Sequence, residues 1–190
     1  MAERSDEARY VAWRAGDREA GDALIREHGP DVLRFLSNKV GPAAEDLLQE
    51  TFMACMRAKT DPAQIRSFRA LLFGVARKQI LRHYEGRGQL KGEEMMSRVS
   101  LAELATTPTE RIARAEERDL LQRAMATIPL DYQIALELRY WQRLSAVEVG
   151  EALGLTENGA RTRFRRARDK LEQAYAALAD GAELPPWSED

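Results

Sequence analysis

Apolar residues recur along this chain at intervals of three and four positions, the spacing of one face of an α-helix. No segment alternates apolar and polar residues as a half-buried strand does. We therefore predict an all-α fold. The expected helices in the first half of the chain cover residues 5–16, 17–29, 30–40, 43–59 and 67–84.

Glycine and proline set the expected helix boundaries. Asp17 is placed to cap the second helix, and Pro30, directly after Gly29, is expected to begin a third helix, because proline fits the first helical turn. The pair Gly41-Pro42 interrupts the chain again.

The helical pattern fades between Gly86 and Glu110, where glycine, serine, threonine and proline gather. This composition is typical of a linker. We predict two small helical domains, at 1–85 and 111–178, joined by a flexible linker at 86–110 and followed by an acidic tail at 179–190.

The segment from Leu144 to Leu171 predicts a helix-turn-helix. Ser145 and Glu148 have the spacing of a capping box, in which each side chain accepts from the other residue's backbone N–H. Gly154 can adopt the left-handed conformation that ends a helix, and Thr156 can cap the next one.

The second helix of this motif is amphipathic and basic. Its inward stripe is Ala160, Phe164, Ala167 and Leu171, which leaves short polar groups central on the outer face. Cations on both sides of that face form a rim suited to phosphates, as in a helix that reads duplex DNA. The rim residues are Arg161, Arg163, Arg166, Arg168 and Lys170.

The overall charge is unusual for a protein that holds duplex DNA unaided. The 29 Lys and Arg residues are outnumbered by 31 Asp and Glu residues, which gives a net charge of −2. Since DNA affinity depends on phosphate neutralisation, either a larger assembly supplies much of the binding, or the chain is a small dimeric repressor.

Composition also indicates the cellular compartment of the protein and whether it binds a metal or cofactor. Cys55 is the single cysteine and lies on an apolar helical stripe, so we expect a core thiol in a reducing compartment. The chain has neither an apolar run of about 18 residues nor a signal peptide, which indicates a cytoplasmic protein without membrane insertion. His28 and His83 lack partners at ligand spacing, so we expect no metal and no cofactor.

Two predicted helices in the first half of the chain have side chains suited to binding a partner. The helix at 43–59 presents an acidic strip, Glu45, Asp46, Gln49 and Glu50. The helix at 67–84 interleaves aromatic and basic residues, a combination that holds single-stranded nucleic acid but that also suits a helix core.

Taken in order, four motifs resemble the extracytoplasmic-function (ECF) sigma factors, a family of bacterial RNA polymerase sigma factors. The motifs are Ala44–Phe52, Ser67–Arg77, Ile128-Pro129 and Leu144–Arg168, and the resemblance covers roughly residues 8–175.

This resemblance implies a sigma factor that directs promoter-specific initiation. Its implied partners are core RNA polymerase (β′ and β subunits), promoter DNA and an anti-sigma factor. The residues implied to bind the clamp helices of the β′ subunit are Glu45, Asp46, Gln49 and Glu50. The implied −10 contacts are Phe68, Arg69, Arg77, Lys78 and Arg82, and the implied −35 contacts are Thr156, Glu157, Asn158, Arg161, Thr162, Arg165 and Arg168.

Two departures from the family pattern affect DNA reading. Asn158-Gly159-Ala160 replaces the usual Gly-Thr-Val at the start of the reading helix, and Lys78 stands where many members have asparagine. The promoter sequence therefore cannot be inherited from relatives.

Two other classes of protein compete with this interpretation. A conventional helix-turn-helix regulator that binds duplex operator DNA as a dimer explains 111–178 but gives the acidic strip no role. An enzyme has little support, because the sequence has no catalytic triad pattern and no glycine-rich phosphate loop.

Overall fold

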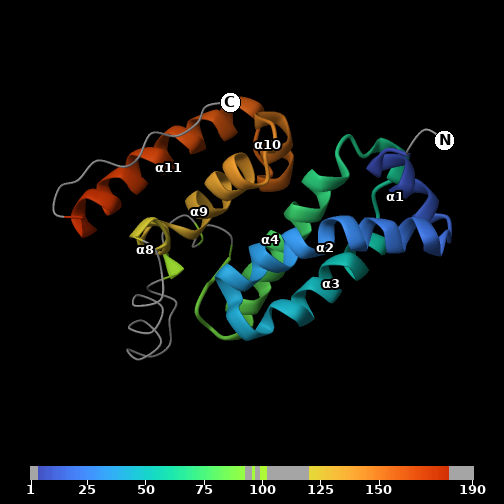
Figure 1. Cartoon of the computed structure of the whole chain (residues 1–190), viewed down its shortest axis with the longest axis horizontal. Coiled ribbons are helices and arrows are strands. Elements are labelled where there is room, and N and C mark those ends of the chain that lie inside the picture. Colours follow the sequence, from blue (N-terminus) through green and yellow to red (C-terminus); the bar gives the residue numbers. More distant parts are fainter. Residues whose placement is uncertain (1–3, 93–95, 97–98, 102–119, 180–190) are drawn as a thin grey trace.

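The computed structural model describes residues 4–92, 96, 99–101 and 120–179. Over these residues the regular elements are helices, and the one β contact is an isolated bridge between Ser100 and Pro129. The all-α prediction is confirmed. The N-terminal module comprises α1 (Asp6–Arg14), α2 (Arg18–Val40), α3 (Ala44–Met56) and α4 (Phe68–Gly86), and the C-terminal module comprises α8 (Leu120–Thr127), α9 (Leu130–Leu136), α10 (Ala146–Leu153) and α11 (Glu157–Leu178) (Figure 1).

Short turns complete the two modules. Two 3₁₀ turns, at Gly41–Ala43 and Pro62–Gln64, precede α3 and α4, and a π-helical turn, Glu137–Trp141, continues α9. Most of the predicted linker, and all of the predicted tail at 179–190 except Ala179, lie outside the described residues.

The prediction that Pro30 begins a new helix is wrong, because α2 continues through it from Arg18 to Val40. Proline removes one backbone hydrogen bond and usually kinks a helix interior. Here Pro30 is exposed, while Leu24 and Val32 on either side of it are fully buried. The apolar stripe therefore crosses the proline without a break, and core packing holds the two halves of α2 in one line.

Side-chain caps start the helices where the sequence places them. Asp17, Ser67 and Thr156 each accept a hydrogen bond from the backbone N–H three residues later. Ser145 and Glu148 form the complete capping box, and Gly154 ends α10 in the left-handed conformation with φ 68°. The predicted helix-turn-helix is thus present, with both of its helix starts fixed by local sequence.

Both modules contribute to one hydrophobic core, with α4 in the middle of the molecule between α3 and α10 (Figure 1). Leu72 and Ile80 of α4 belong to the same buried cluster as Ile134 of α9 and Val149 of α10. A second, smaller cluster holds α11 against α8 and α9; it comprises Ala124, Ile128, Leu136, Ala167 and Leu171.

Some residues of the predicted linker also belong to this core. Leu90, Met96 and Leu101 are buried, and the backbone N–H of Leu130 donates to the carbonyl of Val99 at 2.9 Å. The described part of 86–110 therefore packs along the two modules instead of standing free of them.

Cys55 is fully buried in α3, where the Tyr10 hydroxyl donates to its backbone carbonyl at 2.9 Å. Burial raises the pKa of the thiol to about 12, against a smaller opposing effect of Arg14. The predicted core thiol is confirmed. Separately, none of the described helices is long and apolar enough to cross a membrane.

A close approach at Gly150 yields the first prediction. A Cβ atom there would lie 2.8 Å from the carbonyl oxygen of Leu155, so Gly150→Ala forces the turn away from α10. We expect a loss of about 1–3 kcal/mol in the free energy of unfolding, measured by urea denaturation.

The matched control is Gly86→Ala at the end of α4, where nothing lies within 4 Å of the added Cβ. This change should leave stability unchanged or raise it by up to about 1 kcal/mol. Equal effects of the two substitutions would contradict the proposed close approach.

Candidate nucleic-acid interface

The acidic strip lies on the solvent side of α3. Its four residues, Glu45, Asp46, Gln49 and Glu50, are all exposed. Leu47 and Thr51 on the other side of the helix are buried, and the Thr51 hydroxyl donates back to the Leu47 carbonyl at 2.6 Å. The structure therefore brings the four predicted polymerase-binding residues together on one open surface.

An apolar groove runs beside the acidic strip, between α1, α2 and α3. Met53 and Ile25 on its border are partly exposed, at 47% and 40%. Sequence reasoning did not single it out, because its walls come from three helices. The apolar lining is Trp13, Ile25, Leu48, Phe52, Met53 and Met56.

The first turn of α4 is tied to the C-terminal module. The Ser67 hydroxyl accepts from the Ala70 N–H at 3.2 Å and donates to the Glu148 carboxylate at 2.7 Å. One serine thus caps α4 and contacts α10 at once.

Glu148 has a pKa below the usual carboxyl range. Burial acts to raise it, but hydrogen bonds from the Ser145 backbone and from the Ser67 and Ser145 hydroxyls, together with the charge of Arg69, outweigh burial. The carboxylate is therefore held ionised where α4 meets α10.

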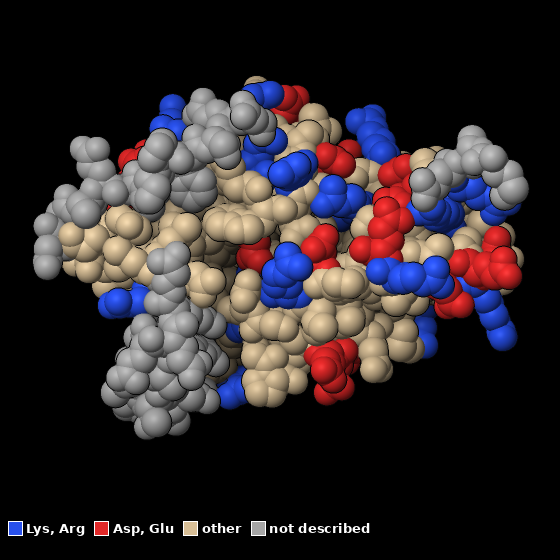
Figure 2. Space-filling view, in the orientation of Figure 1, with Lys and Arg blue, Asp and Glu red and all other residues tan. Residues whose placement is uncertain are grey.

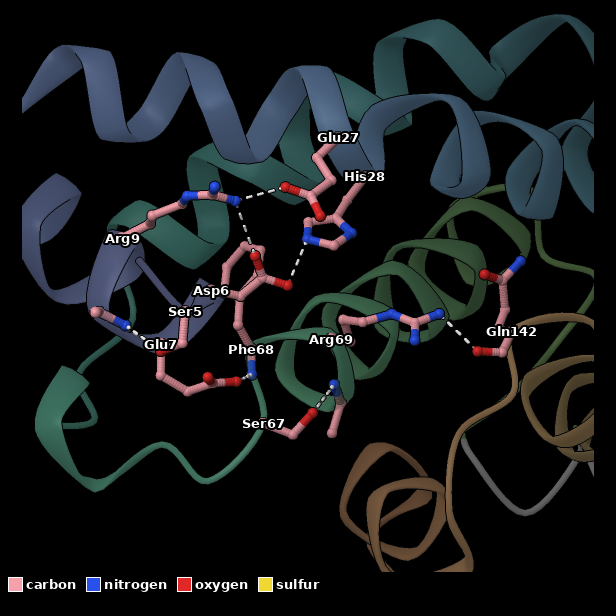
Figure 3. A network of polar contacts seen from close by, with 12 residues as sticks. Ser5, Asp6, Glu7, Arg9, Glu27, His28, Ser67, Phe68, Arg69 and Gln142 are labelled. Carbon is pink, nitrogen blue, oxygen red and sulfur yellow. Dashed lines mark hydrogen bonds and ion pairs between the residues drawn. The ribbon is translucent and has the colours of Figure 1, made fainter. Parts of the chain in front are cut away.

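Phe68 is fully buried, although the sequence predicts that it contacts DNA. Its ring lies 5.2 Å from that of Tyr10 and 5.7 Å from that of His28, measured between centroids. Its backbone N–H donates to the Glu7 carboxylate at 3.1 Å (Figure 3). In this structure a nucleobase cannot reach the Phe68 ring, which instead anchors α4 to α1 and α2.

An ion-pair network surrounds this anchor (Figure 3). The side-chain oxygen and nitrogen atoms of Asp6, Glu27 and His28 that could bind a metal lie within 4.8 Å of one another. The spacing of these residues in the sequence does not predict this grouping. The guanidinium of Arg9 pairs with Asp6 at 3.4 Å and with Glu27 at 2.6 Å, so both carboxylates already have a cationic partner within the protein.

Two of the predicted −10 arginines make contacts inside the molecule. Arg69 donates to the backbone carbonyl of Gln142 at 2.6 Å (Figure 3), and Arg77, only 4% exposed, pairs with Asp131 at 3.1 Å. Lys78 and Arg82, the other predicted −10 cations, are exposed. Arg66, which the sequence analysis passed over, is also exposed and lines a cleft with Lys78 between α4 and α10.

The expected outer face of α11 is largely open. Thr156, Glu157, Asn158, Arg161 and Arg165 are exposed, whereas Thr162 and Arg168 are half-buried. Arg161 pairs with Glu157 at 2.6 Å and Arg168 with Glu172 at 3.4 Å, one turn away in each case. Six of the seven predicted −35 residues therefore lie on α11 and the seventh, Thr156, caps it, while i,i+4 partners hold Arg161 and Arg168.

The prediction that Arg163 belongs to the exposed rim is wrong. Its guanidinium pairs with Asp131 at 3.1 Å and lies 5.4 Å from the centroid of the Tyr132 ring. Asp131 thereby joins Arg163 of α11 to Arg77 of α4. The two pairs span 32 and 54 residues of sequence, so no local pattern indicates them.

Basic and acidic side chains alternate over the face of the molecule shown in Figure 2. No continuous basic surface appears on that face, in keeping with the net charge of −2. That face therefore offers no continuous positive surface of the kind that holds duplex DNA by phosphate neutralisation.

Both modules match family models of known proteins. A family model described as Sigma-70 region 2 matches residues 24–89, and one described as Sigma-70, region 4 matches residues 118–171. The first match covers most of α2 through α4, and the second covers α8 to α10 with most of α11.

Curated relatives agree with these matches. The chain is 28% identical over 173 residues to the ECF RNA polymerase sigma factor BldN of Streptomyces coelicolor, covering 86% of this chain but only 64% of BldN. It is 29% identical over 171 residues to the RNA polymerase sigma factor CarQ of Myxococcus xanthus, covering 87% of this chain and 95% of CarQ.

A solved structure shares the fold. CnrH, in its complex with the cytosolic domain of CnrY, superposes with a TM-score of 0.65 at 21% identity, covering 92% of this chain and 97% of CnrH.

The low pKa of Glu148 predicts how acid affects stability. A carboxylate whose folded pKa lies below its unfolded value of about 4.3 stabilises the protein above that value, and the stabilisation is lost as pH falls through the folded pKa. Glu148→Gln should therefore lower Tm most near about pH 7, and the gap from the wild type should narrow towards about pH 3.

The control is Glu151→Gln, a change at an exposed carboxylate on the same helix. Thermal melts across this pH range should show little difference between this variant and the wild type. A Tm gap for Glu148→Gln that stays constant with pH would contradict the assigned role of its charge.

Proposed function

The chain belongs to the ECF group of the sigma-70 family, and from that membership we propose that it binds core RNA polymerase and directs initiation at specific promoters. The single observation that carries the proposal is the presence in one chain of region 2 and region 4, the latter as a capped helix-turn-helix. The function consists of binding and strand separation, and it requires no catalytic residue.

The proposed polymerase-binding surface is the acidic strip of α3. All four of its residues are exposed, and the carboxylates of Asp46 and Glu50 lie one helical turn apart. Such a surface is suited to a basic partner, which in this family is the clamp helices of the β′ subunit. The exposed apolar border at Met53 lies next to it on the same helix.

The proposed reader of the −10 element is α4. Lys78 and Arg82, with Arg66 just before the helix, present exposed cations for the backbone of the separated strand. Arg69 and Arg77 belong to the same reader but are engaged internally in this structure. The buried ring of Phe68 supports the helix from behind.

The proposed reader of the −35 element is the N-terminal half of α11. Asn158 and Arg165 are exposed and offer donors to base edges in the major groove, while Arg161 and Arg168 offer charge to phosphates. A conventional dimeric regulator accounts for this helix alone, but not for region 2 in the same chain.

We also propose an anti-sigma factor as a protein partner. The supporting observation is that CnrH, which shares the fold, was solved with the cytosolic domain of CnrY bound. Affinity purification from the native cell should recover a regulatory protein beside polymerase. Recovery of polymerase alone, with full activity whenever the chain is expressed, would contradict this partner.

Polymerase dependence is tested by in vitro transcription from the promoter upstream of the chain's own gene. We expect specific initiation only with core polymerase, and a loss of about tenfold or more in an Asp46→Arg, Glu50→Arg variant, because like charges across an interface cost several kcal/mol. The control reverses two exposed charges of α2, Glu19→Arg and Asp22→Arg, and should initiate normally. Duplex binding without polymerase and no initiation with it would favour the regulator.

Base reading by α11 is tested with Arg165→Ala in the assembled holoenzyme. Loss of a base contact costs about 1–3 kcal/mol, so affinity for duplex promoter DNA should fall roughly 5- to 150-fold. Arg34→Ala removes an arginine of α2 that is also exposed and should have little effect. Equal losses in the two variants would indicate a general charge effect without base reading.

A further inference from the structure

A cavity of about 500 Å³ lies between α2 and the C-terminal module. Its lining comes from the last turns of α2, from α8, and from α9 with the π-helical turn that follows it. None of its described lining residues belongs to the acidic strip or to the proposed DNA readers. The volume is in the range of about 300–1,000 Å³ that is typical of small-molecule sites, and the proposed function gives the cavity no role.

The clearest sign of a ligand is the side chain of Gln142, which is only 4% exposed and lines the cavity. Its backbone carbonyl accepts from Arg69, yet over the part of the chain that the structure describes its side-chain amide makes no hydrogen bond. In Figure 3 this amide points away from Arg69. A buried amide without a protein partner costs free energy, and a hydrogen-bonding group that enters the cavity recovers it.

The backbone that presents Gln142 is irregular. Its N–H donates to the carbonyl of Glu137, five residues earlier, at 3.0 Å, which is the hydrogen bond of the π-helical turn. This wider turn carries Gln142 to the side of the helix on which Gln133 and Glu137 line the cavity. Arg143, the next residue, has a left-handed φ of 52°, uncommon for a residue other than glycine. Both π turns and left-handed residues of this kind recur at functional sites.

The remaining walls suit a flat ring with a polar edge. Trp141 is 50% exposed, and Leu121 and Met125 are half-buried beside the same cavity. Gln133, also 4% exposed, donates through Nε2 to the Ile128 carbonyl at 3.0 Å, which fixes the orientation of a second amide. Proteins bind an unpaired nucleobase with this combination, by stacking on its face and hydrogen bonding to its edge.

The charged residues of the cavity already have partners. Lys39, only 2% exposed, pairs with Glu137, and Arg34 pairs with Asp31 at 3.6 Å. Arg34 is the one exposed cation among the described lining residues. The cavity therefore lacks the row of positive charges that follows the backbone of a nucleic-acid strand, and its charges favour an uncharged ligand.

We propose that this cavity binds a free nucleobase or nucleoside, with the ring against Trp141 and the polar edge on the amides of Gln133 and Gln142. The inference goes beyond the proposed function and does not depend on it, because no residue assigned to polymerase or promoter DNA takes part. A bound nucleoside contacts both α2 and the C-terminal module, and it stabilises the folded chain by mass action.

The experiment titrates the full-length protein with adenosine, guanosine, cytidine and uridine in turn, by isothermal titration calorimetry and by thermal melting. We expect at least one nucleoside to bind saturably at one site per chain and to raise Tm. The Trp141 indole N–H resonance, assigned by its loss in Trp141→Ala, should shift on binding. Binding that leaves this resonance unmoved would place the ligand elsewhere and overturn the proposal.

Two variants test the assigned contacts. Gln142→Leu keeps a similar bulk but removes the amide, and it should weaken nucleoside binding at least about fivefold. Trp141→Ala removes the stacking face and should also weaken binding by about fivefold or more. Because Trp141 is half exposed, its variant keeps the proposal testable if Gln142→Leu fails to fold, with circular dichroism as the check.

The matched control is Gln173→Leu, the same substitution at an exposed glutamine of α11 that does not line the cavity. This variant should bind the nucleoside as the wild type does. The site would be overturned by the absence of binding with all four nucleosides, by unchanged binding in both cavity variants, or by an equal loss in Gln173→Leu.

A final arm distinguishes a free nucleoside from a base of a DNA strand. A single-stranded oligodeoxynucleotide of mixed sequence is titrated into the same variants and followed by fluorescence anisotropy. We expect Gln142→Leu to leave its affinity unchanged. If the oligonucleotide binds through Gln142 and the nucleosides do not bind, the cavity takes a base of DNA and the proposal fails.

Discussion

The arrangement of the two described modules depends on the carboxylate of Asp131, which is buried between two arginines from different helices. An isolated charge in a protein interior is very costly, so a buried guanidinium fixes its counter-charge close to it. Arg77 therefore ties α9 to α4, and Arg163 ties α11 to α9, in addition to the apolar contacts between these helices. One acidic side chain sets the position of both the proposed −10 and −35 readers.

At the start of α4, single residues also make more than one structural contact. Ser67 caps the helix and contacts Glu148, while Phe68 enters the core and its N–H meets Glu7. Glu148 is in turn the residue that completes the capping box of α10. The two helix starts are thus coupled through a single carboxylate, and a change in its charge affects local capping and the contact between modules together.

Local features of the fold were predictable from sequence, and contacts distant in sequence were not. The capping box of Ser145, the left-handed Gly154 and the buried stripe of α11 all follow from spacing within a few residues. The prediction of a new helix at Pro30 was wrong because the preference of proline for a helix start is outweighed by burial of the apolar residues on both sides of it. The ion pairs of Arg77 and Arg163 with Asp131 could not be predicted from sequence. A basic residue on an amphipathic helix does not indicate a partner 54 or 32 positions away.

Several cations of this chain, whose net charge is −2, are used inside the protein. Arg77 and Arg163 share the carboxylate of Asp131, and Lys39 pairs with Glu137, so these three cations attract nucleic acid less than free cations would. The proposed DNA surfaces are left with a short basic face on α11 and a few exposed cations around α4. We expect such a surface to read sequence once another protein has brought DNA close, and to capture DNA from solution poorly. The proposed polymerase-binding acidic surface and a proposed DNA surface that is weak alone therefore follow from one distribution of charge.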